Sequence, residues 1–190
     1  MYPIVMVGID EVGRGCLAGP LLVVAARKKG RLPKGIKDSK LLTRAQRERL
    51  FEELVGVCDF GEGWVTSSEI DKQGLAKAMR LGVARALKNL GTTCTEPIIV
   101  DGQVNYLSRK FKNIECLVGA DATVRIVSAA SVYAKVRRDR FMIELAKKYA
   151  GYGFENHVGY FTTGHKLALK NLGPLKSIHR MSFQPLRGTG

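Results

Sequence analysis

The chain has 190 residues, of which 45% are hydrophobic, enough for one domain with a sizeable core. Lysine and arginine total 31 against 17 aspartates and glutamates, which gives a formal charge of +14. Such a positive field favours polyanions, nucleic acid before an anionic membrane surface. No apolar run approaches the length of a membrane span, so composition excludes a membrane-spanning protein.

The expected secondary structure alternates strands and helices. Apolar runs indicate strands, helical spacing of apolar residues indicates helices, and a capping-box pattern at Thr43–Gln46 opens the first helix. In chain order, we expect strands at 4–9 and 21–26, a helix from 44 to about 56, a weaker strand at 57–65, a helix at 75–90 closed by Gly91, short strands at 97–100 and 114–118, a long helix at about 124–149, and a short helix at 167–172.

This order predicts an α/β fold with a mixed sheet. Small residues at 128–131, near the start of the long helix, predict close packing of that helix on the sheet. The segment after Gly151 is rich in glycine and aromatic residues and predicts a loop before the short helix. Neither an internal repeat nor a low-complexity stretch is present.

Cysteine usage indicates a reducing compartment. Cys16, Cys58, Cys94 and Cys116 form no C-x-x-C pair, so we expect free thiols rather than a zinc site or a disulfide framework. The start of the chain lacks a signal-peptide pattern and leads directly into the first strand. We therefore expect a cytoplasmic protein.

Carboxylates follow two of the expected strands. Asp10 and Glu11 come after the first strand, Asp101 ends the strand at 97–100, and Asp121 precedes the long helix. Neighbouring strands lie about 5 Å apart, so Asp10 and Asp101 would face each other and repel unless a cation lies between them. Carboxylates without histidine or cysteine select Mg²⁺ or Mn²⁺, and two such ions hydrolyse phosphodiesters. Helix-capping roles and ion pairs with arginines are the alternatives.

A glycine-rich turn follows the first two carboxylates. Gly13 and Gly15 flank Arg14, and glycines let backbone N–H groups approach a ligand closely. Carboxylates beside glycines and an arginine suit a metal ion and a phosphate-bearing chain. The alternative is a solvated turn.

An ordered set of motifs resembles the ribonuclease HII (type 2 ribonuclease H) family over nearly the whole chain. The motifs are G-I-D-E-V-G-R-G at 8–15, L-A-G-P at 17–20, D-S-K at 38–40, E-I-D at 69–71, V-D-G at 100–102, A-D at 120–121, S-A-A-S-x-x-A-K-V-x-R-D at 128–139, H-x-G-Y at 157–160 and H-R-x-S-F at 179–183.

The resemblance implies a ribonuclease H-like fold, with a mixed five-stranded sheet flanked by helices and a C-terminal helical extension. It divides the single domain into a catalytic core at 1–150 and an extension at 151–190 that carries a substrate-contacting loop and a short helix. The implied activity is cleavage of RNA in RNA–DNA hybrids and on the 5′ side of single ribonucleotides in duplex DNA. That cleavage leaves 5′-phosphate and 3′-hydroxyl ends and serves ribonucleotide excision repair.

The resemblance also implies the site residues. The four catalytic, metal-binding carboxylates carry over to Asp10, Glu11, Asp101 and Asp121, with two Mn²⁺ or Mg²⁺ ions. The implied substrate-binding residues are Gly13, Arg14 and Gly15 at the ribonucleotide 2′-hydroxyl, Ser39 and Lys40 of D-S-K, and Tyr160 at the sugar of the RNA-to-DNA step. A 2′-hydroxyl is the group by which a protein distinguishes RNA from DNA.

The sequence departs from the family pattern in places. Leu41 replaces a second lysine after D-S-K, and Phe161 replaces the proline that commonly follows the tyrosine. The chain begins at the first strand, which favours the HII over the HIII branch. A sliding-clamp-binding tail is not evident at 187–190, and we expect a monomer that binds no membrane.

Other polar residues are interpreted as structural. Asp139 lies on an apolar helix stripe, where it is either an extra metal ligand or, as we favour, the partner of an arginine or of Lys135 at i−4. His157, His165 and His179 have no metal-like spacing and are interpreted as substrate-loop or packing residues.

Two other functions compete with this interpretation. A junction resolvase of the same fold would need no device for a 2′-hydroxyl. A non-catalytic basic RNA-binding protein would bind through phosphate contacts and would have no reason to end two buried strands on carboxylates.

Overall fold

The structure is a computed structural model that describes residues 6–36 and 42–188. Its elements in chain order are β1 (Val7–Val12), β2 (Leu21–Lys28), α1 (Arg44–Val57), β3 (Cys58–Val65), α2 (Ser67–Gln73), α3 (Leu75–Leu90), β4 (Ile98–Asp101), β5 (Ile114–Leu117), α4 (Ala120–Thr123), α5 (Arg125–Lys148), α6 (Phe154–His157) and α7 (Thr163–Leu172).

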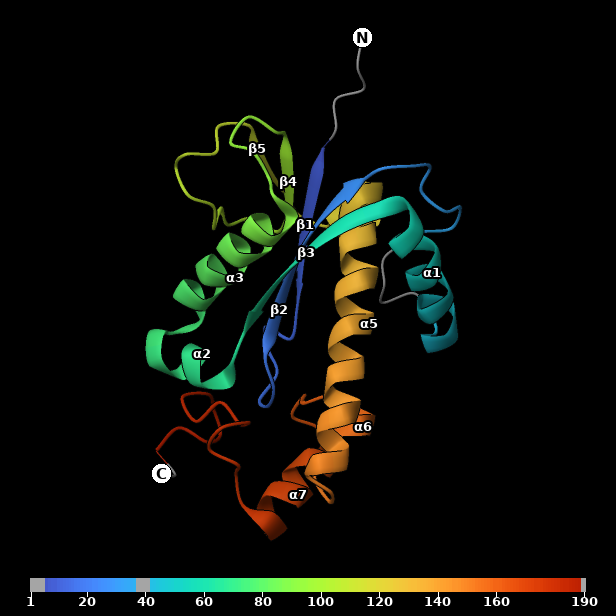
Figure 1. The fold of residues 1–190 in the computed structure, drawn as a ribbon. Helices are drawn as coiled ribbons and strands as arrows, with labels where there is room; N and C mark the ends of the chain where they lie inside the picture. The colour runs from blue at the N-terminus through green and yellow to red at the C-terminus, as the bar shows by residue number, and fades with distance from the viewer. Residues whose placement is uncertain (1–5, 37–41, 189–190) are drawn as a thin grey trace.

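The five strands form one mixed sheet in the order β3-β2-β1-β4-β5 (Figure 1). The central strand β1 pairs antiparallel with β2 and parallel with β4. The outer strands extend these pairings, because β3 is antiparallel to β2 and β5 is parallel to β4. The predicted mixed five-stranded sheet flanked by helices is therefore confirmed.

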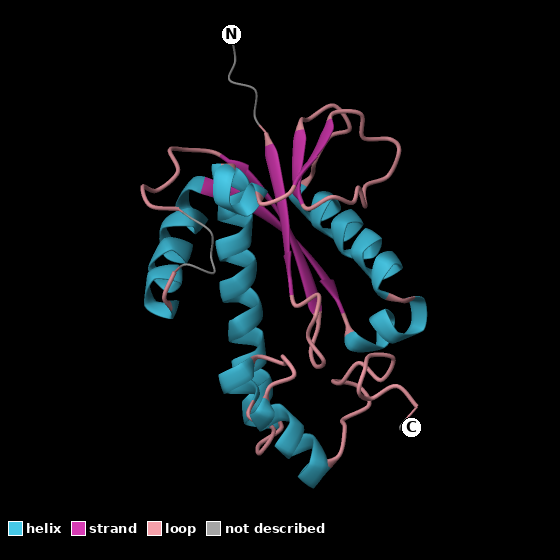
Figure 2. Ribbon diagram, turned by 180° about the vertical axis from the view of Figure 1, so that it is seen from behind, coloured by secondary structure: helices cyan, strands magenta, loops and turns pink. Residues whose placement is uncertain are grey.

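Helices cover both faces of the sheet. Helices α2 and α3 lie on one side and α1 and α5 on the other, as Figures 1 and 2 show from opposite directions. Side chains of β2 alternate between the two faces of the sheet. Leu21, Val23 and Ala25 pack with α3, whereas Leu22 and Val24 pack with α5 and α1. Each face thus buries its own apolar cluster.

The long helix α5 packs closely on β1, as the small residues at 128–131 predict. All four of these residues are buried. The approach is so close that a Cβ at Gly8 would lie 2.6 Å from the backbone carbon of Ile126. This contact brings the side chains of α5 within reach of those on β1.

Several helix boundaries match the sequence. The capping box at Thr43 and Gln46 opens α1, and Gly91 closes α3 in the left-handed conformation, with φ of 69°. Helix α1 ends at Val57, one residue beyond the expected Gly56. Local signals fixed these ends because caps act within one turn of the chain.

The first strand differs from the prediction. It spans Val7–Val12 rather than 4–9, so Asp10 and Glu11 lie inside the strand instead of after it. The reason is tertiary pairing, because the ladder with β2 continues to the pair Val12 and Leu22. Residues 4 and 5 lie outside the described residues.

Four helical segments were missed or misplaced by sequence reasoning, among them the four-residue helix α4 that carries Asp121. Helix α2 contains the E-I-D motif and opens with a capping box between Thr66 and Glu69. The short helix α6 lies in the segment expected to be a loop. Helix α7 begins at Thr163 rather than 167, because the Thr162 hydroxyl caps it by accepting from the backbone N–H of His165.

The segment after Gly151 lies at the foot of α5 (Figure 1). Tyr152, Phe154 and Ala168 share an apolar cluster with Ala18 and Met142, so the segment is packed against α5 and the loop after β1. Within residues 6–36 and 42–188, no helix has both the length and the hydropathy needed to cross a membrane.

Candidate active site

Asp10 and Asp101 lie side by side on the neighbouring strands β1 and β4. Strands β1 and β4 run parallel with Ile9 opposite Val100, and the same register places Asp10 next to Asp101. Asp10 points towards α5, where the Ser131 hydroxyl donates a hydrogen bond to its carboxylate. The predicted juxtaposition of these two carboxylates is therefore present, although Asp10 lies within its strand.

Glu11 points to the opposite side of β1 from Asp10, as strand alternation requires. Its carboxylate lies 3.5 Å from the Arg14 guanidinium, which in turn lies 3.5 Å from the Tyr106 hydroxyl. The backbone N–H of Glu11 donates to Asp10 Oδ1 at 2.8 Å. The two carboxylates thus flank the end of one strand.

A cavity of about 250 Å³ collects most of the predicted site residues. Asp121 does not line this cavity; it is buried in α4, with a relative exposure of 4%. Its neighbour in the chain, Ala120, contacts the cavity wall, because the Ala120 backbone N–H donates to Asp101 Oδ1 at 2.8 Å. The residues that line the cavity are Asp10, Glu11, Val12, Gly13, Arg14, Gly15, Arg47, Asp101, Ser131, Lys135 and Tyr160.

The environment of Asp10 disfavours its charged form. Burial raises the pKa of its carboxyl to about 8, and the nearby carboxylates of Glu11 and Asp101 add to the rise. The described residues contain no group of three or more His, Cys, Asp or Glu side chains already arranged to hold a metal ion. The donors are carboxylate oxygens, however, so a hard divalent cation matches both their chemistry and their excess of negative charge.

A buried arginine packs against Gly13 and bonds the segment that follows the glycine-rich turn. Arg138 of α5 is fully buried and donates to the carbonyls of Pro20 at 2.9 Å and Val158 at 2.8 Å, and also to Ala18. Gly13 has φ of 84° and sits so close that a Cβ there would lie 2.2 Å from Arg138 Nε. The turn therefore requires glycine at this position.

A second buried arginine reaches the same turn from the C-terminal segment. Arg180 donates to the carbonyls of Arg14 at 2.8 Å and Gly13 at 2.6 Å, and its Nη2 donates to Gly19 at 3.0 Å. Burial lowers the pKa of Arg180 to about 10, which still leaves it charged at neutral pH. The shape of the turn thus depends on a residue far along the chain.

Tyr160 reaches the cavity from a loop that docks on the segment after the turn. The backbone N–H groups of Leu17 and Ala18 both donate to the carbonyl of Gly159, at 2.9 and 3.1 Å. Tyr160 is 41% exposed, and Lys135 Nζ lies 6.0 Å from its ring centroid. The described structure therefore brings Tyr160 to the same cavity as Arg14.

Three histidines pack together behind the Tyr160 loop. His179 accepts from the backbone N–H of Leu175 at Nδ1, so its Nε2–H donates to His165 Nε2 at 3.0 Å. His165 Nδ1–H then donates to the carbonyl of Tyr160 at 2.9 Å. His157 stacks on His165 with ring centroids 4.3 Å apart. The packing interpretation of these histidines is confirmed, and this chain of bonds requires neutral imidazoles.

Asp139 pairs with Lys135 at i−4, with 2.9 Å between Nζ and Oδ1. The pairing of Asp139 with Lys135 that the sequence predicted is therefore present. Ser39 and Lys40 lie outside the described residues.

Sequence reasoning did not assign three polar residues that line the cavity, namely Arg47, Ser131 and Lys135. Ser131 and Lys135 lie one turn apart on the face of α5 that meets β1, and their motif was part of the resemblance. Arg47 comes from α1 and carried no sequence signal, because its approach to the cavity depends on the packing of α1 against α5.

The comparisons with known proteins agree on the class of fold. A ribonuclease HII from Archaeoglobus fulgidus, solved in complex with PCNA, superposes with a TM-score of 0.79 at 28% identity, over 92% of this chain and 93% of that one. Ribonuclease H2 from Pyrococcus horikoshii gives 0.74 at 29% identity, over 96% and 95%. The fold is thus that of a type 2 ribonuclease H.

The sequence profile described as Ribonuclease HII matches residues 7–186. Ribonuclease HII of Nitrobacter winogradskyi is 42% identical over 94% of this chain and 68% of its own length, and that of Thermotoga petrophila is 40% identical over 96% and 74%. The chain belongs to the ribonuclease HII family, whose members are nuclease hydrolases of the ribonuclease H type.

Proposed function

We propose that this chain is an endonuclease that cuts the RNA strand of RNA–DNA hybrids and also cuts on the 5′ side of single ribonucleotides in duplex DNA. The products carry 5′-phosphate and 3′-hydroxyl ends. The observation that carries the proposal is the single cavity lined by three carboxylates, the turn at 13–15 and Tyr160.

The proposed metal ligands are Asp10, Glu11, Asp101 and Asp121. When bound, two Mn²⁺ or Mg²⁺ ions supply an activated water and stabilise the leaving oxygen. The chain's own contribution is a preformed pair of carboxyl groups: Asp10 and Asp101 are adjacent by strand register, and Ser131 and Ala120 orient them through hydrogen bonds.

The turn at 13–15 is proposed to read the ribonucleotide 2′-hydroxyl. Arg180 donates to the carbonyls of Gly13 and Arg14 from the buried side, and Arg138 donates to the carbonyls of Ala18 and Pro20 in the segment that follows the turn. The Arg14 side chain is about half exposed and stays available to the substrate. Tyr160 presents its ring from the facing loop, where it would pack on the sugar that follows the ribonucleotide.

Further substrate contacts, the role of the C-terminal segment and the oligomeric state are also proposed. Ser39 and Lys40 are proposed to contact the substrate, and residues 151–190 are proposed to act as an extension of the catalytic core that carries the Tyr160 loop. The protein is proposed to act as a monomer in the cytoplasm, on nucleic acid rather than on a membrane.

The decisive experiment compares three end-labelled duplexes: an RNA–DNA hybrid, duplex DNA with one ribonucleotide, and the same duplex without it. Each is incubated with Mn²⁺, with Mg²⁺ and with chelator, and the product ends are mapped. We expect cuts in the first two duplexes only, on the 5′ side of the ribonucleotide in the second, and none with chelator.

Cleavage of the all-DNA duplex, or of a four-way DNA junction, would contradict the ribonucleotide-directed assignment and favour a resolvase. Tight, salt-sensitive binding without cleavage under any metal would instead favour a non-catalytic binding protein.

A further inference from the structure

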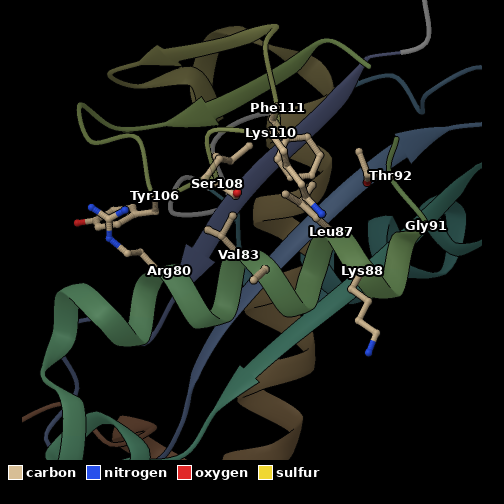
Figure 3. Close-up of a pocket in the computed structure, with 12 residues that line it drawn as sticks. Arg80, Val83, Leu87, Lys88, Gly91, Thr92, Tyr106, Ser108, Lys110 and Phe111 are labelled. Atoms are coloured by element: carbon tan, nitrogen blue, oxygen red, sulfur yellow. The ribbon is translucent and has the colours of Figure 1, made fainter. Parts of the chain in front are cut away.

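A second and larger cavity lies on the opposite side of the sheet from the α5 packing. It is a groove of about 650 Å³ between α3 and the loop that joins β4 to β5. Figure 3 shows Val83 and Leu87 of α3 directed towards Phe111 of the loop, with Arg80 and Tyr106 near one end and Gly91 at the other.

The rim of this groove is positively charged. Arg80, Lys88 and Lys110 line it and are exposed, and none of them forms an ion pair with another residue in the described part of the chain. Arg80 and Lys88 lie along α3 about 12 Å apart. That distance spans about three nucleotides of a stacked strand.

The floor of the groove is apolar, with one polar exception. Val83, Leu87 and Phe111 are each less than a tenth exposed. The Thr92 hydroxyl at the far end is buried and makes no hydrogen bond with any described residue. The apolar lining matches the face of an unpaired base. The Thr92 hydroxyl is buried beneath this lining, out of reach of a ligand in the groove.

The groove and the candidate active site meet at one contact between their lining residues. Tyr106 lines the groove, and its hydroxyl lies 3.5 Å from the Arg14 guanidinium, which lines the carboxylate cavity. A nucleic-acid strand held at Arg14 therefore has a basic path leading away over Tyr106.

We propose that the groove between α3 and the β4–β5 loop binds a single-stranded nucleic-acid segment adjoining the duplex held at the active site. Phosphates lie against Arg80, Lys88 and Lys110, and a base covers the apolar floor. The inference rests on the proposed function, since it extends the same substrate path.

The test measures binding by fluorescence anisotropy with chelator present, so that cleavage plays no part. The probes are a blunt DNA duplex with one ribonucleotide and four derivatives, each with a single-stranded DNA extension of about eight nucleotides at one strand end. We expect at least one extension to tighten binding about fivefold or more, by adding phosphate and base contacts.

Two variants separate charge from shape. Arg80→Glu with Lys88→Glu should remove the gain from the extension and lower the salt slope of log K by about 1.4, the value for two single-strand phosphate contacts. Ala84→Trp leaves the charges in place, fills the groove from an exposed position and should also remove the gain. The control, Lys28→Glu with Lys34→Glu, makes the same change in net charge at exposed positions outside the groove and should retain the gain.

Equal affinity of the native chain for blunt and extended probes overturns the proposal. The same holds if Ala84→Trp keeps the full gain, because the groove itself would then be empty. A further probe is an acidic peptide that contains leucine. If this peptide binds more tightly than any extended duplex, and if the double charge variant no longer binds it, the groove takes a protein ligand and the proposal is overturned. The nuclease assignment is judged separately, by metal-dependent cutting of the blunt probe.

Discussion

The sheet core and the loops of the active site are held together by different forces. On the α3 face, β1 and β2 bury apolar side chains such as Ile9, Leu21 and Val23. At the turn after β1, the buried groups are instead Arg138 and Arg180, which donate to backbone carbonyls. Apolar packing in the core is non-directional, whereas the hydrogen bonds at the turn form only when donor and carbonyl are correctly aligned.

This difference means that fold and site can fail separately. An apolar core tolerates substitutions that conserve side-chain volume. When buried apolar groups are removed, its stability falls with the volume of the cavity that is left. A hydrogen-bonded framework of buried cations fixes the position of a turn, so its loss changes the geometry of the site as well as the stability.

The largest effect is expected from the carboxylates themselves. Asp101→Asn keeps the shape and removes a negative charge that the proposed metal site needs, so we expect nearly all cleavage to be lost while the protein stays folded. Asp10→Asn should behave alike. Single-turnover cleavage at saturating Mn²⁺ measures the loss, with Asp59→Asn, at an exposed ion pair, as control. Activity within about tenfold of the native chain would refute the two-metal assignment.

The next effect tests the framework against the core. Arg180→Met removes donors from the carbonyls of Gly13, Arg14 and Gly19, and we expect about 3 kcal/mol of destabilisation together with a large fall in cleavage. Leu90→Ala in the α3 core should cost a similar 2–5 kcal/mol, roughly, but leave cleavage by the folded fraction unchanged.

Urea unfolding gives the two stabilities, and cleavage at a temperature where both variants are folded gives the activities. If both variants lose activity only in proportion to the unfolded fraction, Arg180 contributes stability alone and the separation of fold from site is wrong.

A smaller effect is expected from Tyr160→Ala. Loss of one stacking contact costs roughly 1–3 kcal/mol, so cleavage at a single ribonucleotide should fall about tenfold to a hundredfold. Cleavage within an all-RNA strand should fall less, because the ring is proposed to act at the RNA-to-DNA step. Tyr160→Phe keeps the ring and should keep the preference. Equal losses on both substrates would place the selectivity at Gly13–Gly15 instead.

The smallest effect is a dependence of stability on pH. Burial lowers the pKa of His179 from 6.5 to about 4, so its stabilising contribution is complete above about pH 6.5. As pH falls from 6.5 towards 4, the unfolded chain takes up the proton first, and the free energy of unfolding should decrease by roughly 2–3 kcal/mol. Below about pH 4 this group adds no further loss.

Urea unfolding between pH 7 and pH 4 measures the decrease, and His179→Gln provides the comparison. Glutamine is neutral at every pH. The difference in free energy of unfolding between the native chain and the His179→Gln variant should therefore become smaller as pH falls. Parallel curves would show that His179 is not the titrating group.

Much of the fold was predictable because its signals are local. Apolar runs marked the strands, and Thr43 and Gly91 marked helix ends through contacts within one turn. The pairing of Asp10 with Asp101 was predictable too, since two buried strands carried acids at matching positions. The ends of β1 were misjudged because its length is set by pairing with β2.

The framework of the site was not predictable in the same way. Arg138 donates to carbonyls about 120 residues away in sequence, and any residue can supply a carbonyl. The side chains of Ala18 and Pro20 therefore do not indicate that Arg138 is their partner. Arg47 was not predicted for a related reason, because it reaches the cavity only through the packing of one helix on another.

The contact between Arg180 and the turn after β1 has a consequence for the order of events during synthesis. The chain emerges from the ribosome N-terminus first, and the sheet with α3 and α5 can assemble before residue 180 is made. The bonds from Arg180 close loops of 166 and 167 residues. The nascent protein therefore carries its carboxylates in place while its turn still lacks a final shape, and competence to cut nucleic acid arrives late, after most of the chain has folded.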